Sequence, residues 1–147
     1  MSLTLKGHVD YWIKLSSEST YDMRAALRSG RRTNALFCGH LAVEKILKAL
    51  CAVRCVPTDQ IWGHNLFKLA SLAGLWVGLT VSQQTELATI TTFNIEARYD
   101  DYKRQFTALC TKQYASQWVS IIEIWCKNIK QIVIQERALL PNNKSAL

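Results

Sequence analysis

The chain has 147 residues, of which 49% are hydrophobic, and it contains only 6 glycines and 2 prolines. That length suits a single domain whose core needs neither disulfides nor metal ions, and the shortage of turn residues indicates long regular elements. The net charge of +7 suits a protein that meets phosphates or acidic partners, whereas the lack of an apolar run of about 20 residues excludes a membrane-spanning segment.

Apolar residues recur at three- and four-residue spacing along most of the chain, which is the pattern of amphipathic helices. Gly30 follows the first such segment as a left-handed stop, and Thr80 with Gln83 matches the capping box that opens a helix. No sustained alternating run is present, so we expect no sheet. The predicted helices cover residues 9–28, 33–53, 66–73, 80–92 and 114–137.

Long helices with short connections predict an all-α fold. We expect an antiparallel up-and-down bundle of four main helices plus the short helix at 66–73. Residues 1–140 are predicted to form this one domain, and residues 141–147, which begin at Pro141, to form a flexible tail.

The cysteines and the first residues indicate a cytoplasmic protein. The five cysteines are odd in number and lie mostly in helix-like sequence, so we expect free thiols in a reducing compartment. The first residues lack the apolar stretch of a signal peptide. Neither a metal-ligand set nor a glycine-rich phosphate loop occurs, and we expect no metal and no cofactor.

The positive charge is concentrated between Arg24 and Arg54, where seven basic residues face one glutamate. This concentration suits phosphate binding, although lysine and arginine are also good helix formers. Within it, His40, Glu44 and Lys48 follow one another at four-residue steps and therefore share a helix face. They form either a surface Glu44–Lys48 pair beside a structural histidine or part of a polar groove.

Three segments resemble the HEPN family (higher eukaryotes and prokaryotes nucleotide-binding domain). Gly39–Leu50 (GHLAVEKILKAL) is similar to its second helix, and Trp62–Leu66 (WGHNL) to the start of its third. Within the latter, His64 and Asn65 suit the capping of that helix. Asn94–Lys103 (NIEARYDDYK) resembles the Ile-Glu-Ala-Arg-Tyr segment before the last helix in one subgroup, whose members usually have proline where this chain has Asp100.

HEPN ribonucleases carry an arginine followed, after four to six residues, by a histidine that acts as the general base. At that spacing from Arg98 this chain has Lys103, Arg104 and Gln105, and its histidines all lie upstream. The resemblance therefore implies binding rather than efficient cleavage, with Arg98 meeting phosphate, Glu96 orienting Arg98, and Tyr99 or Tyr102 stacking or hydrogen-bonding. The candidate nucleotide- or phosphate-binding residues are Glu96, Arg98, Tyr99, Tyr102, Lys103, His40, Glu44 and Lys48.

The resemblance also implies a homodimer whose two Arg98–Tyr99 segments line a shared groove. It further implies a minimal nucleotidyltransferase as the partner in a toxin–antitoxin-like pair. Two alternatives remain: an active, metal-independent endoribonuclease toxin that uses Arg98 with an unconventional base, and a purely structural helical subunit in which Glu96 and Arg98 form an internal salt bridge.

Overall fold

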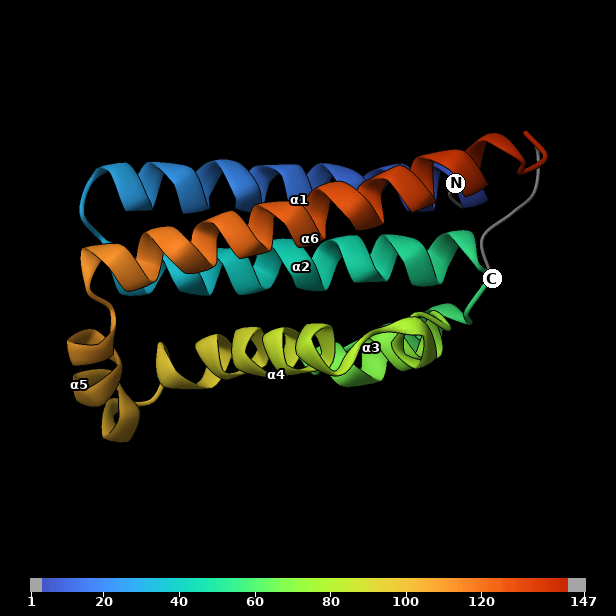
Figure 1. Cartoon of the computed structure of the whole chain (residues 1–147). Coiled ribbons are helices and arrows are strands. Elements are labelled where there is room, and N and C mark those ends of the chain that lie inside the picture. The colour runs from blue at the N-terminus through green and yellow to red at the C-terminus, as the bar shows by residue number, and fades with distance from the viewer. Residues whose placement is uncertain (1–3, 143–147) are drawn as a thin grey trace.

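The computed structural model describes residues 4–142, and every regular element in this range is a helix. The elements are α1 Leu5–Arg28, α2 Arg32–Val53, the 3₁₀ turn η1 Thr58–Gln60, α3 Leu66–Leu72, the 3₁₀ turn η2 Trp76–Gly78, α4 Val81–Glu96, α5 Asp100–Leu109 and α6 Lys112–Ala138. In Figure 1, α1 and α4 run in one direction and α2 and α6 in the other. The predicted all-α, up-and-down bundle is therefore confirmed.

The local signals for helix ends are also confirmed. Gly30 has a φ of 78°, in the left-handed region where a side chain would be strained. At the start of α4, the amide of Thr80 donates to Gln83 Oε1 at 2.9 Å and the amide of Gln83 donates to Thr80 Oγ1 at 3.1 Å, which completes the capping box. These side chains satisfy amides that the helix itself leaves unpaired.

Two predicted helix boundaries were wrong, and one helix was not predicted. Helix α1 begins at Leu5 because Thr4 caps it, accepting a hydrogen bond from the amide of Gly7 at 2.9 Å. Helix α4 continues beyond residue 92 to Glu96, and α5 was not predicted at all. Asp100 and Asp101 occupy the first turn of α5, where acidic side chains favour a helix start. They are the signal that identifies this helix in the sequence.

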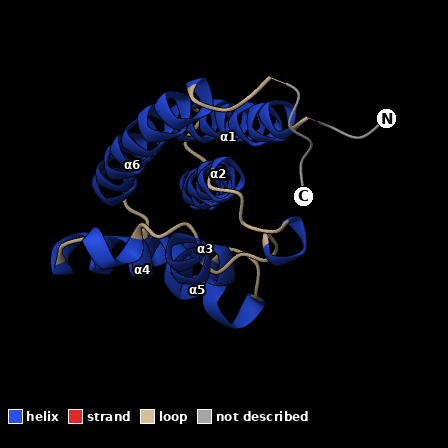
Figure 2. Cartoon of the chain, turned by 90° about the vertical axis from the view of Figure 1, so that its right-hand side faces the viewer, coloured by secondary structure: helices blue, strands red, loops and turns tan. Residues whose placement is uncertain are grey.

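Helix α2 is the centre of the molecule. Seen end-on in Figure 2, it lies between α1 and α6 on one side and the α3–α4 layer on the other. Fifteen of its 22 residues are buried, including apolar residues on every side of the helix. A helix that is apolar nearly all round is stable in water only when other elements enclose it. The remaining helices therefore wrap α2, and any polar side chain on it must find its partners inside the protein.

Gly39 lets α1 and α6 approach α2 closely. A Cβ atom at Gly39 would lie 2.5 Å from Cδ1 of Ile122 on α6 and 3.0 Å from Sδ of Met23 on α1. The first distance is shorter than real Cβ contacts and the second is at their lower limit, so only a hydrogen atom fits at this position. The glycine weakens α2 locally in return for tight packing of three helices.

Three arginines join the long helices at their surfaces. Arg24 Nε donates to Glu123 at 2.9 Å and joins α1 to α6. Arg137 makes a bidentate pair with Asp10 at 2.6 and 2.7 Å across the same two helices. Arg54, just after α2, makes a bidentate pair with Glu136 at 2.9 Å on both arms.

The expectations for the cysteines, the C-terminal tail and membrane-spanning helices concern residues that lie wholly or partly within the described range. All five cysteines are free thiols, as expected. The predicted tail lies mostly outside the described residues, but Asn142 accepts a hydrogen bond from Lys6 Nζ at 2.7 Å. Among the helices of residues 4–142, none combines the length and the apolar character that a membrane crossing requires.

Gly39→Ala should lower the free energy of unfolding by about 1–3 kcal/mol, because the new methyl group overpacks the contact with Ile122. Adding Ile122→Val removes the clashing Cδ1 atom and should restore part of the loss. Urea denaturation of the two variants measures both effects. The control is Gly78→Ala, where an added Cβ meets no atom within 4 Å. Equal stabilities of the Gly39 and Gly78 variants would contradict the packing described.

Candidate functional site

The predicted polar face of α2 is buried around one carboxylate, in what we call the Glu44 cluster: His40, Glu44, Lys48 and His64. The side chain of Glu44 is only 3% exposed. Its Oε1 lies 2.7 Å from Nδ1 of His64, and its Oε2 accepts a hydrogen bond from Lys48 Nζ at 3.2 Å. The Glu44–Lys48 pair is therefore internal, and its interpretation as a surface pair was wrong.

His64 reaches Glu44 from the loop before α3, and it does not cap that helix as the sequence suggested. Asn65 does cap it, accepting a hydrogen bond from the amide of Lys68 at 3.2 Å. The imidazole of His64 instead spans the gap to α2, with 52% of its side chain exposed to solvent. This histidine is the only side chain of the Glu44 cluster that solvent reaches to any extent.

His40 supports the same loop through its backbone. Its Nε2 lies 3.1 Å from the carbonyl oxygen of His64, and because a carbonyl only accepts, Nε2 carries the proton. Nδ1 then has a bare lone pair, has no hydrogen-bond partner within residues 4–142, and lies 3.9 Å from Glu44 Oε1. Burial lowers the pKa of His40 to about 4, against the opposing attraction of Glu44, so the ring is neutral at physiological pH.

Lys48 connects the Glu44 cluster to α1. Its ammonium lies 5.1 Å from the ring centroid of Trp12, whose Nε1 donates to His8 Nε2 at 3.0 Å. A buried charge is tolerated only when partners replace the water it has lost. Glu44 has two such partners and Lys48 has a carboxylate and an aromatic face. The arrangement fastens α1 and the loop before α3 to α2.

The other predicted site residues lie in the Asn94–Lys103 segment, where the chain turns from α4 into α5. We call the three connecting residues, Ala97–Tyr99, the elbow. Arg98 is exposed there and donates from Nη1 to Asn94 Oδ1 at 3.4 Å, one turn back along α4. No ion pair joins Glu96 to Arg98 in the described part of the chain, so the predicted orienting pair, and the internal salt bridge of the structural alternative, are not formed. Residues two positions apart on a helix point in different directions.

Glu96 faces the other way, towards the start of α6. Burial raises its pKa, and its charge contributes to the raised pKa of Cys110 and of Tyr114. For both of those groups burial is the larger cause. Glu96 therefore lies close to the α5–α6 connection, and its carboxylate is poorly suited to meet an anion.

The aromatic side chains of the elbow and α5 divide between solvent and core. Tyr99 and Tyr102 are 57% and 50% exposed. Phe106 is buried, with its ring centroid 5.7 Å from that of Phe93 on α4. Lys103 is exposed and pairs with Asp100 at 3.3 Å within the same helix. The two tyrosines are thus the aromatic groups that an external ligand can reach.

A groove of about 650 Å³ lies where the α1–α2 turn meets the end of α5. Its lining includes Arg31, Arg32, Thr33 and Thr107. Arg32 Nη1 donates to the carbonyl of Cys110 at 3.5 Å, which holds this arginine over the groove. Figure 1 shows the α1–α2 turn, α5 and the start of α6 at the same end of the bundle.

We call this region the basic end, because it gathers arginines from three parts of the chain: Arg28, Arg31, Arg32, Arg98 and Arg104. Arg31 and Arg32 begin α2, where a positive charge opposes the helix dipole and where no acidic residue or side-chain cap compensates. The stability of α2 therefore does not account for these two charges.

The predicted site residues therefore fall into two separate groups. Arg98, Tyr99, Tyr102 and Lys103 lie together on the elbow and α5, and Glu96 lies beside them. The Glu44 cluster is elsewhere, and no hydrogen bond or ion pair within residues 4–142 joins it to Arg98. Within the same range no three side chains of histidine, cysteine, aspartate or glutamate are arranged to hold a metal ion.

Acid should destabilise the protein because burial in the folded chain disfavours the protonated form of His40. The pKa of His40 is about 4 in the folded chain and near its ordinary value of 6.5 in the unfolded chain. Between these values the unfolded chain binds a proton that the folded chain does not, so stability falls as pH falls, by about 1.4 kcal/mol per pH unit. NMR titration of the His40 ring in the folded protein measures this directly. A midpoint near 6.5 would contradict the burial described, and His40→Gln should flatten this part of the stability profile.

Comparisons with known proteins identify the family of the chain. No curated protein and no solved structure matches it significantly. The model of the HEPN domain matches residues 9–132, a range that includes the Glu44 cluster, the elbow and most of α6. The chain therefore belongs to the HEPN domain family.

Proposed function

We propose that this HEPN-domain protein binds the phosphates of a nucleotide or of RNA at its basic end. The observation that supports the proposal is the division of its eight arginines. Three bridge helices through ion pairs with carboxylates: Arg24, Arg54 and Arg137. The other five belong to the basic end, and residues 4–142 supply no carboxylate partner for them. Guanidinium groups without a carboxylate are the side chains best suited to hold phosphate oxygens.

The surroundings of these arginines suit a nucleotide better than free phosphate alone. Tyr99 and Tyr102 expose about half of each side chain next to Arg98, and aromatic faces stack on bases of any sequence. The groove lined by Arg31 and Arg32 falls within the usual range of small-ligand sites, about 300–1,000 Å³. Membership of the HEPN family supports a role connected with nucleotides or RNA.

We propose that the protein binds RNA or a nucleotide without cleaving RNA. Cleavage by the ribose 2′-hydroxyl needs a base near the phosphate. All three histidines lie outside the elbow and α5, and His40 is buried against the carbonyl of His64. A lysine acts as a base only when burial disfavours its charge, and the side chain of Lys103 is 51% exposed and paired with Asp100.

The proposed assembly is a homodimer in contact with a minimal nucleotidyltransferase, as a toxin–antitoxin-like pair. Ile95, Tyr99 and Tyr102 expose large side chains around the elbow, and Leu109 does so at the end of α5. Exposed apolar groups that gather on one surface favour a protein contact. Phe106, which lies on α5 between these residues, is buried in the core and takes no part in that surface. The nucleotidyltransferase itself is supported by the family alone.

Arg98→Ala and Arg32→Ala should each weaken the binding of single-stranded RNA and lower the salt dependence of log K by about one unit, because each removes one phosphate contact. Fluorescence anisotropy of a labelled oligonucleotide over a salt series, in EDTA, measures both. Lys14→Ala is the matched control, since Lys14 is exposed on the middle of α1, away from the basic end.

Equal affinities for the two arginine variants and the Lys14 control would refute the proposed binding surface. If the oligonucleotide is instead cut, and Arg98→Ala abolishes the cutting, the protein is an endoribonuclease that uses an unconventional base.

The protein should sediment as a dimer at micromolar concentration, and Ile95→Asp should convert it to a monomer, because a charge at this 48%-exposed position opposes burial in a contact. Tyr11→Asp, at an equally exposed position on α1, should leave the dimer intact. A wild-type monomer would show that the apolar surface serves another partner.

A further inference from the structure

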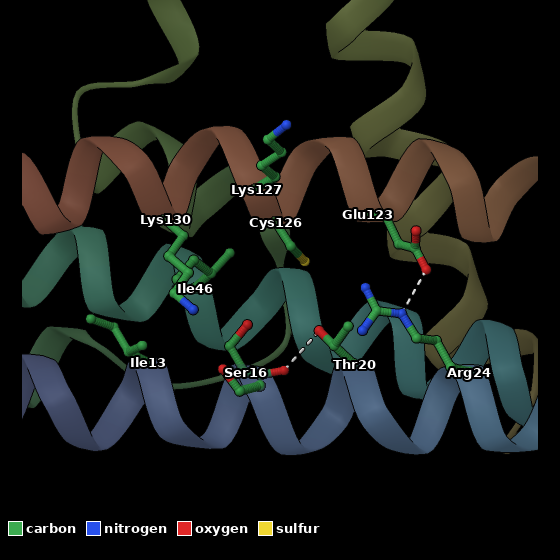
Figure 3. A pocket seen from close by; sticks show the side chains of 10 residues that line it. Ile13, Ser16, Thr20, Arg24, Ile46, Glu123, Cys126, Lys127 and Lys130 are labelled. Atoms are coloured by element: carbon green, nitrogen blue, oxygen red, sulfur yellow. Dashed lines mark hydrogen bonds and ion pairs between the residues drawn. The ribbon is translucent and has the colours of Figure 1, made fainter.

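A second groove, of about 390 Å³, runs between α1 and α6 over the side of α2. Figure 3 shows its lining: Ile13, Ser16 and Thr20 from α1, Ile46 from α2, and Cys126 with Lys130 from α6. It uses the middle turns of the long helices and shares no lining residue with the groove at the basic end. Neither the Glu44 cluster nor the proposed RNA-binding surface explains it.

Two cationic side chains lie at opposite ends of this α1–α6 groove. Arg24 pairs with Glu123 through Nε at 2.9 Å, which leaves both Nη groups directed into the groove in Figure 3. Lys130 extends across the groove towards α1 near Ser16 and has no carboxylate partner in the described chain. Lys127, by contrast, points away from it. Glu123 is the only acidic residue in the lining, and its charge is matched by Arg24.

The floor between the two cations carries no charge. The hydroxyls of Ser16 and Thr20 donate to the carbonyls of Ala42, at 2.8 Å, and of Ser16, at 2.9 Å. Burial raises the pKa of the Cys126 thiol to about 12, so it stays neutral. Ile13 and Ile46 complete an apolar surface. A ligand in this groove meets the Nη groups of the Arg24–Glu123 pair at one end, the unpaired Lys130 at the other, and a neutral, partly apolar surface along its middle.

The distance between the two ends of the α1–α6 groove favours an elongated ligand. At a helical rise of about 1.5 Å per residue, the turns of α1 at Ser16 and Arg24 are roughly 12 Å apart. An elongated anion spans these two turns better than a single phosphate does. We propose that the α1–α6 groove binds a small elongated polyanion, such as a linear oligophosphate or an organic bisphosphate, with acidic groups held by Arg24 and Lys130. This site is independent of the function proposed for the basic end.

Titration calorimetry with inorganic tripolyphosphate, and with orthophosphate for comparison, tests the site. The protein carries Arg32→Ala and Arg98→Ala throughout, which reduces binding at the basic end, and the comparison of the Lys130 and Lys14 variants isolates the contribution of the α1–α6 groove. Tripolyphosphate should bind more tightly than orthophosphate. Lys130→Gln should weaken tripolyphosphate about two- to fivefold, as expected for the loss of one exposed charge contact, whereas Lys14→Gln on the outer side of α1 should leave it unchanged.

Glu123→Gln gives an effect of opposite sign, which loss of folding does not mimic. It removes the one negative charge of the groove and frees Arg24, so tripolyphosphate should bind about two- to fivefold more tightly. Equal affinities of the Lys130 and Lys14 variants would overturn the proposal. So would Glu123→Gln binding no more tightly than its parent, or tripolyphosphate binding no better than orthophosphate.

Discussion

The burial of α2 is the constraint on which the rest of the structure depends. Because this helix is enclosed along most of its length, its polar side chains must be satisfied from within the protein. Glu44 meets that requirement with Lys48 on its own helix and His64 from the loop before α3. The loop is thereby fixed to the middle of α2. That attachment holds the start of α3, which Asn65 caps, against the central helix.

This constraint separates residues that hold the fold from residues that remain free to bind. The Glu44 cluster has the residue types of a reaction centre, yet its charges are paired with one another and only His64 reaches solvent. Three arginines are likewise used to join helices. The five arginines without a carboxylate partner in the described chain lie on the α1–α2 turn, the elbow and α5. The chain thus offers its unpaired guanidinium groups at one end of the bundle.

Much of the fold follows from local patterns in the sequence, because helix periodicity and caps act over a few residues. The stripe of α6, the stop at Gly30 and the capping box at Thr80 are of this kind. Helix α5 buries only Phe106 and so has no apolar stripe that would predict it. The two aspartates in its first turn are the local signal for its start.

The environment of the candidate residues depends on long-range contacts and could not be predicted in the same way. Four-residue spacing makes Glu44 and Lys48 neighbours whether their helix is buried or exposed, so the sequence pattern does not distinguish the two cases. The contact of His64 with Glu44 spans 20 residues, and that of Arg24 with Glu123 spans 99. Such pairs depend on how the helices pack against one another, which local sequence patterns do not determine.

The central claim is that ligand phosphates meet the basic end while the polar face of α2 serves the fold. NMR chemical-shift mapping during titration with a short RNA oligonucleotide tests it most directly. The account predicts shifts at the amides of Arg31, Arg32, Arg98 and Tyr99, with those of His40, Glu44 and Lys48 unchanged. Shifts centred on His64 and Lys48, with none at the elbow, would contradict it.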